Sequence, residues 1–327
     1  QEMAENVVKN QVNSLAGYRV GNGAALVTNP KNGEILAMVG SKDYWDQEHD
    51  GNVNVALSLR QPGSSIKVVN YALALEKGFT PATIIDDSPI SFSVSGQPAY
   101  TPVNYDNKFH GQVTLRQALA NSYNIPAVKI LSKLGVLTMI EKGRKMGITS
   151  WTDPSRFGLS LTLGGGEVTM LDMARVYNTL ANNGNLEELT PILKITDYKG
   201  EILEEDKAQE AENVISEGIA FLLANILADN NARSAAFGPN SLLNIPGKTV
   251  SVKTGTTNNL RDNWAIGYTP SYVVTTWVGN NDNSPMSGIA SGITGATPIF
   301  HDLMTNLLKD KPDEVFAQPA EVIRSQA

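Results

Sequence analysis

Ser64 and Lys67, three residues apart, are the first pair of side chains that could act together in catalysis. Between Ser64 and Gly78 the chain is apolar nearly all round, which predicts a buried helix with this pair at its first turn. Residues three apart share a helix face, so the hydroxyl and the amine would meet. Free N–H groups at a helix start can bind an oxyanion, and an apolar setting favours a neutral amine that can accept the serine proton. The pair could therefore supply a serine nucleophile. Taken by itself, a helix cap followed by a snorkelling lysine is the favoured interpretation, because S-x-x-K often occurs by chance.

The second candidate is Ser122-Tyr123-Asn124, between two predicted helices at 114–120 and 126–134. A serine and an amide two residues apart on a loop can project together. Ser122 could then relay a proton, and Asn124 could hydrogen-bond a substrate amide carbonyl. Taken by itself, this cluster is also typical of an ordinary cap and turn.

The third candidate is Lys253-Thr254-Gly255-Thr256, which follows a β-branched run. On a strand, Lys253 and Gly255 share one side, while Thr254 and Thr256 share the other. Bringing Lys253 and Thr256 into one cleft therefore requires a local twist or a bulge near Gly255. The missing side chain of Gly255 would let a substrate backbone approach.

In this order, S-x-x-K, S-x-N and K-T-G resemble the motif set of penicillin-binding proteins and class A β-lactamases. The flanking sequence, over about residues 20–310, looks like the transpeptidase domain of class A penicillin-binding proteins. Two positions depart from the family pattern, because Val68 replaces a frequent proline and Ser251-Val252 replaces Ala-Gly. Five blocks carry the resemblance: RQPGSSIK at 60–67, LRQALANSYNIPAV at 115–128, LGGGEV at 163–168, KTGTTN at 253–258 and DNWAIGYTP at 262–270.

The resemblance implies a D,D-transpeptidase that joins peptidoglycan stem peptides through an acyl-enzyme. By this likeness, Ser64 attacks the D-Ala-D-Ala carbonyl and releases the terminal D-Ala, with Lys67 as the preferred base. Ser122 and Lys253 share a proton-relay and electrostatic role. Asn124 holds the donor peptide, and Tyr123 lines the cleft.

The resemblance also implies how the substrate is held. The backbone N–H groups of Ser64 and Thr256 would form the oxyanion hole. The hydroxyls of Thr254 and Thr256, helped by the charge of Lys253, would bind the carboxylate of the substrate or of a β-lactam. Gly255 belongs to the same substrate-binding strand.

The implied fold is α/β (α+β), a five-stranded mainly antiparallel sheet flanked by helices, with an inserted all-helical lobe and the cleft between. The apolar and β-branched runs in the sequence are consistent with this fold. They predict strands near both ends of the chain and helices in the middle. We expect a linker at 1–20, a transpeptidase domain at 21–312 and a polar tail at 313–327. Within the domain, the sheet lobe would take about 21–60 and 190–312, and the helical lobe about 61–189.

Composition excludes several classes of function. The 327 residues include 26 Lys plus Arg, 33 Asp plus Glu and no Cys, and the net charge is −7. The lack of Cys excludes a disulfide scaffold, a thiolate zinc site and a cysteine nucleophile. Net acidity argues against a nucleic-acid partner. No apolar run reaches the ~18 residues of a membrane span.

The partners expected from the resemblance are stem peptides, as D-Ala-D-Ala donor and amine acceptor, and β-lactam antibiotics. No cofactor and no metal are expected. The chain starts at Gln1 without a signal pattern, so we interpret it as excised from a longer protein. A glycosyltransferase domain and a membrane anchor upstream are expected, with the protein at the extracytoplasmic face of the bacterial cell membrane.

Other functions remain open from the sequence. A β-lactamase would need an extra base for hydrolysis, for which Glu167 is the candidate, and a D,D-carboxypeptidase would use water in place of the amine. A β-lactam sensor would keep the adduct. A Ser-His-Asp hydrolase is less favoured, because His49, His110 and His301 lack a local signature. The acidic residues around His49 indicate a solvated loop, since they lack a metal-ligand pattern.

Overall fold

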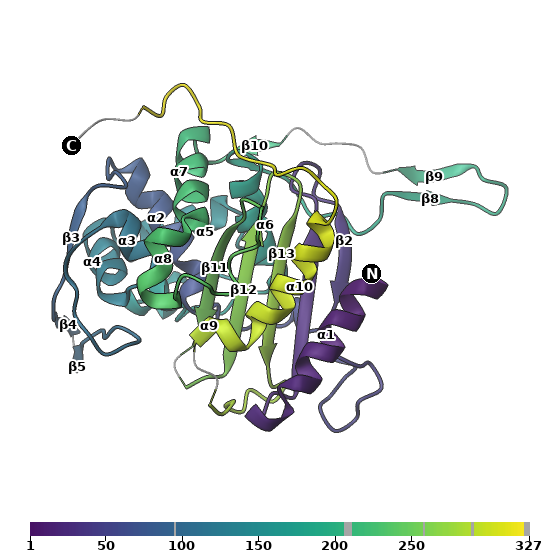
Figure 1. Cartoon of the computed structure of the whole chain (residues 1–327), viewed down its shortest axis with the longest axis horizontal. Helices are drawn as coiled ribbons and strands as arrows, with labels where there is room; N and C mark the ends of the chain where they lie inside the picture. The colour runs from purple at the N-terminus through teal and green to yellow at the C-terminus, as the bar shows by residue number, and fades with distance from the viewer. Residues whose placement is uncertain (95, 206–210, 258, 289–290, 324–327) are drawn as a thin grey trace.

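The centre of the molecule is a five-stranded antiparallel sheet, in the order β11–β12–β13–β1–β2 (Figure 1). The computed structural model describes residues 1–94, 96–205, 211–257, 259–288 and 291–323. The predicted sheet is confirmed: it joins the two ends of the chain, because β1 runs antiparallel to β13. Its strands are β1 (Asn22–Thr28), β2 (Ile35–Val39), β11 (Ser251–Thr256), β12 (Asp262–Tyr268) and β13 (Val273–Gly279).

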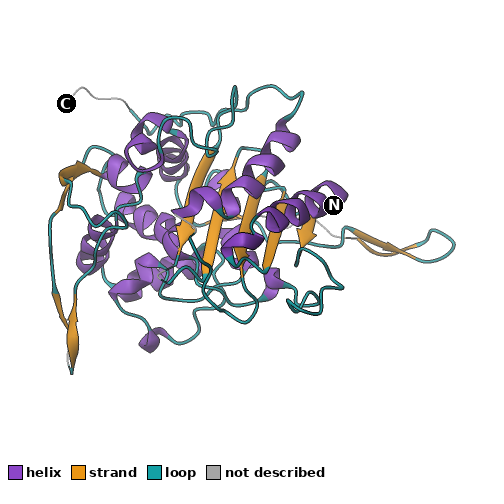
Figure 2. Cartoon of the chain, turned by 60° about the horizontal axis from the view of Figure 1, so that its bottom comes forward, coloured by secondary structure: helices purple, strands orange, loops and turns teal. Residues whose placement is uncertain are grey.

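Successive side chains of the sheet face two different cores, as strand geometry requires. In β12, Trp264 and Ile266 belong to the core shared with α2 (Lys67–Glu76), α6 (Met170–Ala181) and α7 (Glu217–Ala228). Ala265, between them, belongs to the core shared with the first and last long helices. The sheet is therefore a middle layer between two layers of helices (Figure 2).

Residues 1–20 form part of the second helical layer, where the sequence analysis expected a linker. Helix α1 (Glu2–Ser14) packs on β1, β2 and α10 (Ala296–Leu308). Ala4, Val8 and Val12, four residues apart, lie on one stripe of the helix and are buried. This stripe is narrow, and apart from Met3 and Val7 the rest of the helix is polar, which hid the amphipathic pattern.

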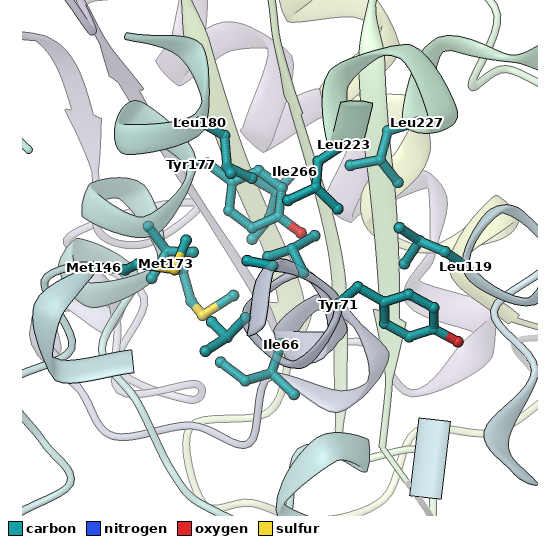
Figure 3. Close-up of a cluster of buried hydrophobic side chains, with 14 of the residues drawn as sticks. Ile66, Tyr71, Leu119, Met146, Met173, Tyr177, Leu180, Leu223, Leu227 and Ile266 are labelled. Carbon is teal, nitrogen blue, oxygen red and sulfur yellow. The ribbon is translucent and has the colours of Figure 1, made fainter. Parts of the chain in front are cut away.

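Helix α2 lies at the centre of the helical lobe. Figure 3 shows it surrounded by apolar side chains from several helices and from the sheet, Leu223 and Ile266 among them. The neighbouring helices are α3 (Leu115–Ala120), α4 (Asn124–Leu134), α5 (Val136–Lys145) and α7, and α6 contributes side chains to the same core. Because α2 is enclosed on all sides, its apolar composition follows from its position.

Two features differ from the predicted all-helical lobe. It also contains the paired strands β3 (Ile84–Asp87) and β6 (Gly111–Thr114), and the hairpin β4 (Phe92–Val94) with β5 (Gln97–Tyr100). Helix α7 packs on α2 and α3, and α8 (Asn230–Phe237) packs on α3, although both follow residue 190. Tertiary contacts thus extend the lobe beyond the expected 61–189 segment.

Shorter elements complete the fold. Strand β7 (Asn185–Leu186) pairs with β10 (Glu212–Asn213), and β8 (Lys194–Thr196) with β9 (Ile202–Glu205) forms a hairpin that projects from the body (Figure 1). The remaining short helix is α9 (Ser291–Thr294). The 3-10 turns are η1 (Ala16–Tyr18), η2 (Val55–Leu57), η3 (Gly63–Ile66), η4 (Pro154–Arg156) and η5 (Leu159–Leu163).

The segment after α10 runs back over the body. Phe316 packs edge-on against Tyr268, and Glu321 Oε1 accepts a hydrogen bond from the Gly218 N–H at 2.6 Å. The expected tail at 313–327 is thus anchored as far as Glu321, and 324–327 lie outside the described residues. Within the described chain, no helix is both long and apolar enough to cross a bilayer.

Candidate active site

Ser64 lies in the 3-10 turn η3, immediately before α2, and is partly exposed at the floor of a cleft. The Lys67 N–H donates to the Ser64 carbonyl, three residues back. Side chains three apart eclipse each other in a 3-10 turn, so the Ser64 hydroxyl and the Lys67 stem lie on the same side. The predicted helix start is therefore one tight turn followed by the α-helix.

The loop that carries Ser64 is pressed against β11 without room for side chains. Gly63 has a φ of +54°, and a Cβ there would lie 2.7 Å from the Thr256 nitrogen. A Cβ on Gly255 would lie 2.1 Å from the Pro62 carbonyl oxygen. The space at Gly255 that the sequence analysis assigned to a substrate backbone is thus filled by the protein's own loop. Glycine is required here for packing that places Ser64 beside β11.

Lys67 is fully buried and anchors the second motif. Its Nζ lies 2.7 Å from the Ser122 carbonyl oxygen, 3.1 Å from the Tyr123 carbonyl oxygen and 2.8 Å from Asn124 Oδ1, all within hydrogen-bond distance. The Ser122 hydroxyl oxygen lies 3.5 Å from the same nitrogen. Within the described chain, the Ser64 hydroxyl has no hydrogen-bond partner.

Ser122 lies between α3 and α4 with a φ of +62°, in the left-handed region that non-glycine residues seldom occupy. Such a conformation persists where surrounding contacts hold it, and it occurs often at functional sites. The two carbonyls that Lys67 binds belong to this turn. The lysine therefore holds the Ser122 hydroxyl in place as well as facing it.

Lys253 reaches the same hydroxyl from the opposite wall. Its Nζ lies 2.7 Å from Ser122 Oγ and 3.0 Å from the Thr254 carbonyl oxygen. β11 pairs with β12 along its whole length without a register shift, so no bulge is needed at Gly255. Because β11 is an edge strand, side chains from both of its faces can border one groove. Thr254 and Thr256 line the cleft.

Burial lowers the pKa of both amines. Loss of solvation lowers the pKa of Lys253 to about 7. The pKa of Lys67 falls well below its usual range, first because the amine is buried and then because Lys253 repels a second positive charge. A nearby carboxylate, Asp87, opposes this decrease. A neutral amine beside a serine is the chemistry expected of a base for nucleophilic attack.

The cleft has a volume of about 800 Å³ and includes all three motifs. Ser64, Ser122, Tyr123 and Asn124 line it together with Thr254 and Thr256. The structure thus brings the predicted residues into one site, with Lys67 and Lys253 buried behind it. Asn258, the last residue of the fourth block, lies outside the described residues.

Part of the cleft was missed by the sequence analysis. Tyr105, Asp106 and His110 line one wall, and Phe237 from α8 lines another. The His110 ring stacks on Tyr123 with 3.9 Å between ring centroids. Residues 79–112 carry no periodic pattern, so only the tertiary structure places them here. The LRQALANSYN block that follows was the available signal that the neighbouring chain is near the site.

The residues weighed for other chemistries lie elsewhere. Glu167 pairs with Arg156 at 3.4 Å and is not among the described residues that line the cleft. His49 contacts Asp46, and His301 contacts the Leu242 carbonyl. Within the described chain, no group of three or more His, Asp or Glu side chains could hold a metal ion.

Comparison with known proteins agrees with this geometry. Residues 23–305 match the family model of the penicillin binding protein transpeptidase domain. The chain is 36% identical over 306 residues to penicillin-binding protein 1A of Aquifex aeolicus, covering 92% of the chain and 40% of that protein. It is 33% identical over 311 residues to penicillin-binding protein 1A of Neisseria meningitidis, covering 93% and 38%. The chain spans about two fifths of the length of these curated relatives.

Solved structures show the same fold. Penicillin-binding protein 1A from Haemophilus influenzae superposes with a TM-score of 0.82 at 30% identity, over 92% of this chain and 50% of that one. PonA1 from Mycobacterium tuberculosis, in complex with penicillin V, superposes with a TM-score of 0.81 at 24% identity, over 98% and 88%. The chain belongs to the penicillin-binding protein transpeptidase family.

Proposed function

We propose that this chain is a serine D,D-transpeptidase that crosslinks peptidoglycan stem peptides and is acylated by β-lactams. One observation carries the proposal: the Ser122 hydroxyl lies between the amines of Lys67 and Lys253, in the same cleft that Ser64 lines. Ser64 would be the nucleophile. The alternatives differ only in the fate of the acyl group.

The reaction we propose has two steps. In the first, the neutral Lys67 amine accepts the Ser64 proton as Oγ attacks the carbonyl between the two D-Ala residues. The C–N bond breaks, and the proton passes by way of Ser122 to the amine of the leaving D-Ala. In the second, the acceptor amine attacks the Ser64 ester, forms the new amide and returns a proton to Oγ. The lowered pKa of Lys67 supports its role as base.

Substrate binding would use the cleft walls. Asn124 would hold the donor peptide, and Thr254 and Thr256 would bind the terminal carboxylate near the Lys253 charge. The backbone N–H groups of Ser64 and Thr256 would form the oxyanion hole. The packing of Gly63 against the Thr256 backbone supports this assignment, because it brings the two segments together.

The expected setting of the enzyme is part of the proposal. The transpeptidase domain, residues 21–312 of this chain, would act at the extracytoplasmic face of the bacterial membrane. It would be part of a longer protein whose upstream region carries a glycosyltransferase domain and a membrane anchor. The relatives support this, because each is much longer than the aligned region. No cofactor is assigned a role in this reaction.

Mass spectrometry tests the nucleophile. Incubation with benzylpenicillin should raise the intact mass by one ligand, and peptide mapping should place the ligand on Ser64. Ser64→Ala should remain unlabelled, while Ser132→Ala, a change at an exposed serine of α4, should label normally. Labelling of the Ser64→Ala protein would refute the assignment.

The lifetime of the adduct separates a transpeptidase from a β-lactamase. We expect slow release, because Glu167 pairs with Arg156 and does not line the cleft. Nitrocefin turnover at many per second would favour a β-lactamase instead. A D-Ala-D-Ala peptide incubated with an amine acceptor should give more amide than hydrolysed product, whereas hydrolysis alone would indicate a carboxypeptidase.

A further inference from the structure

A buried carboxylate outside the three motifs lies behind the Ser122–Asn124 turn. Asp87, at the end of β3, has no exposed surface. It accepts hydrogen bonds from Asn104 Nδ2 at 2.8 and 2.9 Å, from the His110 N–H at 3.1 Å and from His110 Nδ1 at 2.6 Å. Burying a carboxylate costs free energy unless hydrogen bonds compensate for the lost solvation, and these four hydrogen bonds provide that compensation.

Asn104 connects Asp87 to the active-site turn by hydrogen bonds. Its Oδ1 accepts from the N–H of Asn124 at 2.8 Å and from the N–H of Ile125 at 3.3 Å. These are the first two N–H groups of α4, whose own N-cap residue, Tyr123, supplies no side-chain cap. The amide of Asn104 therefore caps α4 from another part of the chain.

The hydrogen bonds then continue to the proposed base. Asn124 Oδ1 accepts from Lys67 Nζ at 2.8 Å, and Asn124 Nδ2 donates to the Val103 carbonyl at 2.8 Å. A continuous chain thus runs from Asp87 through Asn104 and Asn124 to Lys67. His110, held by Asp87, stacks on Tyr123 and supports the same turn from the cleft side.

We propose that Asp87 is a positioning residue for acylation, which fixes Asn124 through Asn104 and places a buried negative charge near Lys67. This inference rests on the proposed function and adds a residue that none of the three motifs contains. Asp87 does not line the cleft, so its effect on the reaction is indirect.

The charge gives the proposal a measurable signature. Among the described residues, the charged groups that act on Lys67 are Lys253 on β11 and Asp87 on β3. Asp87 also contacts the titratable ring of His110, which contacts Asp106 as well, and its charge acts on Tyr71 and Tyr123. Lys253 lowers the pKa of Lys67 and Asp87 raises it. Removing the Asp87 charge should therefore lower the pKa of Lys67 further, so the amine becomes neutral at lower pH.

The experiment compares Asp87→Asn with Asp86→Asn, the same change one residue earlier. Asp86 is exposed and pairs with Lys129, so it is a matched control. The second-order rate constant for acylation by a fluorescent penicillin is measured from pH 4 to pH 9, together with thermal unfolding. In Asp87→Asn we expect the maximal rate to fall about 10- to 100-fold, the effect of losing hydrogen bonds to a charged group. The acid limb should also move to lower pH.

Each outcome has one meaning. Asp87→Asn with an unmoved acid limb, or with the same rates as Asp86→Asn, would overturn the inference. Absence of acylation in the wild-type protein would instead overturn the proposed function. If Asp87→Asn does not fold, Asn104→Ala tests the inference instead. This change removes the hydrogen-bonded connection between Asp87 and Asn124 and keeps the negative charge of Asp87. For Asn104→Ala we expect a similar loss of acylation rate, with the acid limb of the pH profile at its wild-type position. A wild-type acylation rate in this variant would overturn the inference.

Discussion

At the scale of residues, the site depends on two amines that burial has made weak bases. Lys67 and Lys253 both reach the Ser122 hydroxyl, so a proton on one changes the affinity of the other for a second proton. Such pairs titrate together, and the apparent pKa values belong to the pair. One amine can then be neutral and serve as the base while the other stays charged for the substrate carboxylate.

This division of roles predicts a bell-shaped pH dependence for acylation by penicillin. The rate should rise on the acid side as Lys67 becomes neutral. It should fall on the alkaline side near pH 7, because Lys253, with a pKa of about 7, loses the charge that attracts the carboxylate. Stopped-flow measurement of the second-order rate constant tests this.

A variant assigns the alkaline limb. Arginine keeps its charge throughout the range, so Lys253→Arg should lose that limb whatever its maximal rate. An alkaline limb that persists unchanged in Lys253→Arg would show that another group titrates there.

At the scale of elements, the turn that carries the nucleophile is held between a loop and a strand. A Cβ on Gly164, whose φ is +91°, would lie 2.3 Å from the Gly63 nitrogen, and Gly63 itself lies against Thr256. The Tyr177 hydroxyl donates to the Ser65 carbonyl at 2.8 Å. Backbone packing on both sides thus sets where Ser64 stands relative to β11.

We predict that Gly164→Ala displaces this turn. The free energy of unfolding should fall by about 1–3 kcal/mol, as in overpacked sites. The rate of acylation should fall at least tenfold, since nucleophile position controls the reaction. Gly158→Ala is the control, because a Cβ there meets nothing within 4 Å. Chemical denaturation and penicillin labelling measure both effects, and a wild-type labelling rate in Gly164→Ala would contradict the account.

At the scale of the whole molecule, the sheet separates the reacting side from a supporting side. The motifs lie where β11 meets the helical lobe, while α1 and α10 cover the other face. Because β1 comes from the beginning of the chain and β11–β13 from its end, the sheet closes only when both ends have folded together. Stability and catalysis can therefore be changed separately.

Val8→Ala tests this separation. Val8 is fully buried on α1, so the loss of two methyl groups should lower the free energy of unfolding by about 2 kcal/mol. Acylation at 25 °C should be unchanged, since α1 lies on the face away from Ser64. Asn6→Ala, an exposed change on the same helix, should alter stability by less than about 0.5 kcal/mol. A large loss of acylation in folded Val8→Ala would contradict the separation.

The sheet strands, the central helix and the three motifs could be predicted from local patterns in the sequence. Alternating and helical apolar patterns are local, so the β-branched runs at the two ends and the apolar stretch after Ser64 could be recognised directly. A local signal also marks the start of α6, where Thr169 and Asp172, three residues apart, form a capping box. The order of the motifs then indicated the family that the comparisons confirm.

The contacts that hold those residues in place could not be predicted from the sequence, because they form between segments far apart in the chain. Gly255 gives room to the Pro62 carbonyl, and Asp87 reaches Asn124 through Asn104, across gaps in sequence that no local pattern spans. The narrow apolar stripe of α1 likewise could be recognised as a packing face only once the structure placed it on the sheet. Periodicity reports which side of an element is buried, whereas close packing and buried hydrogen bonds depend on which distant segments come together in the fold.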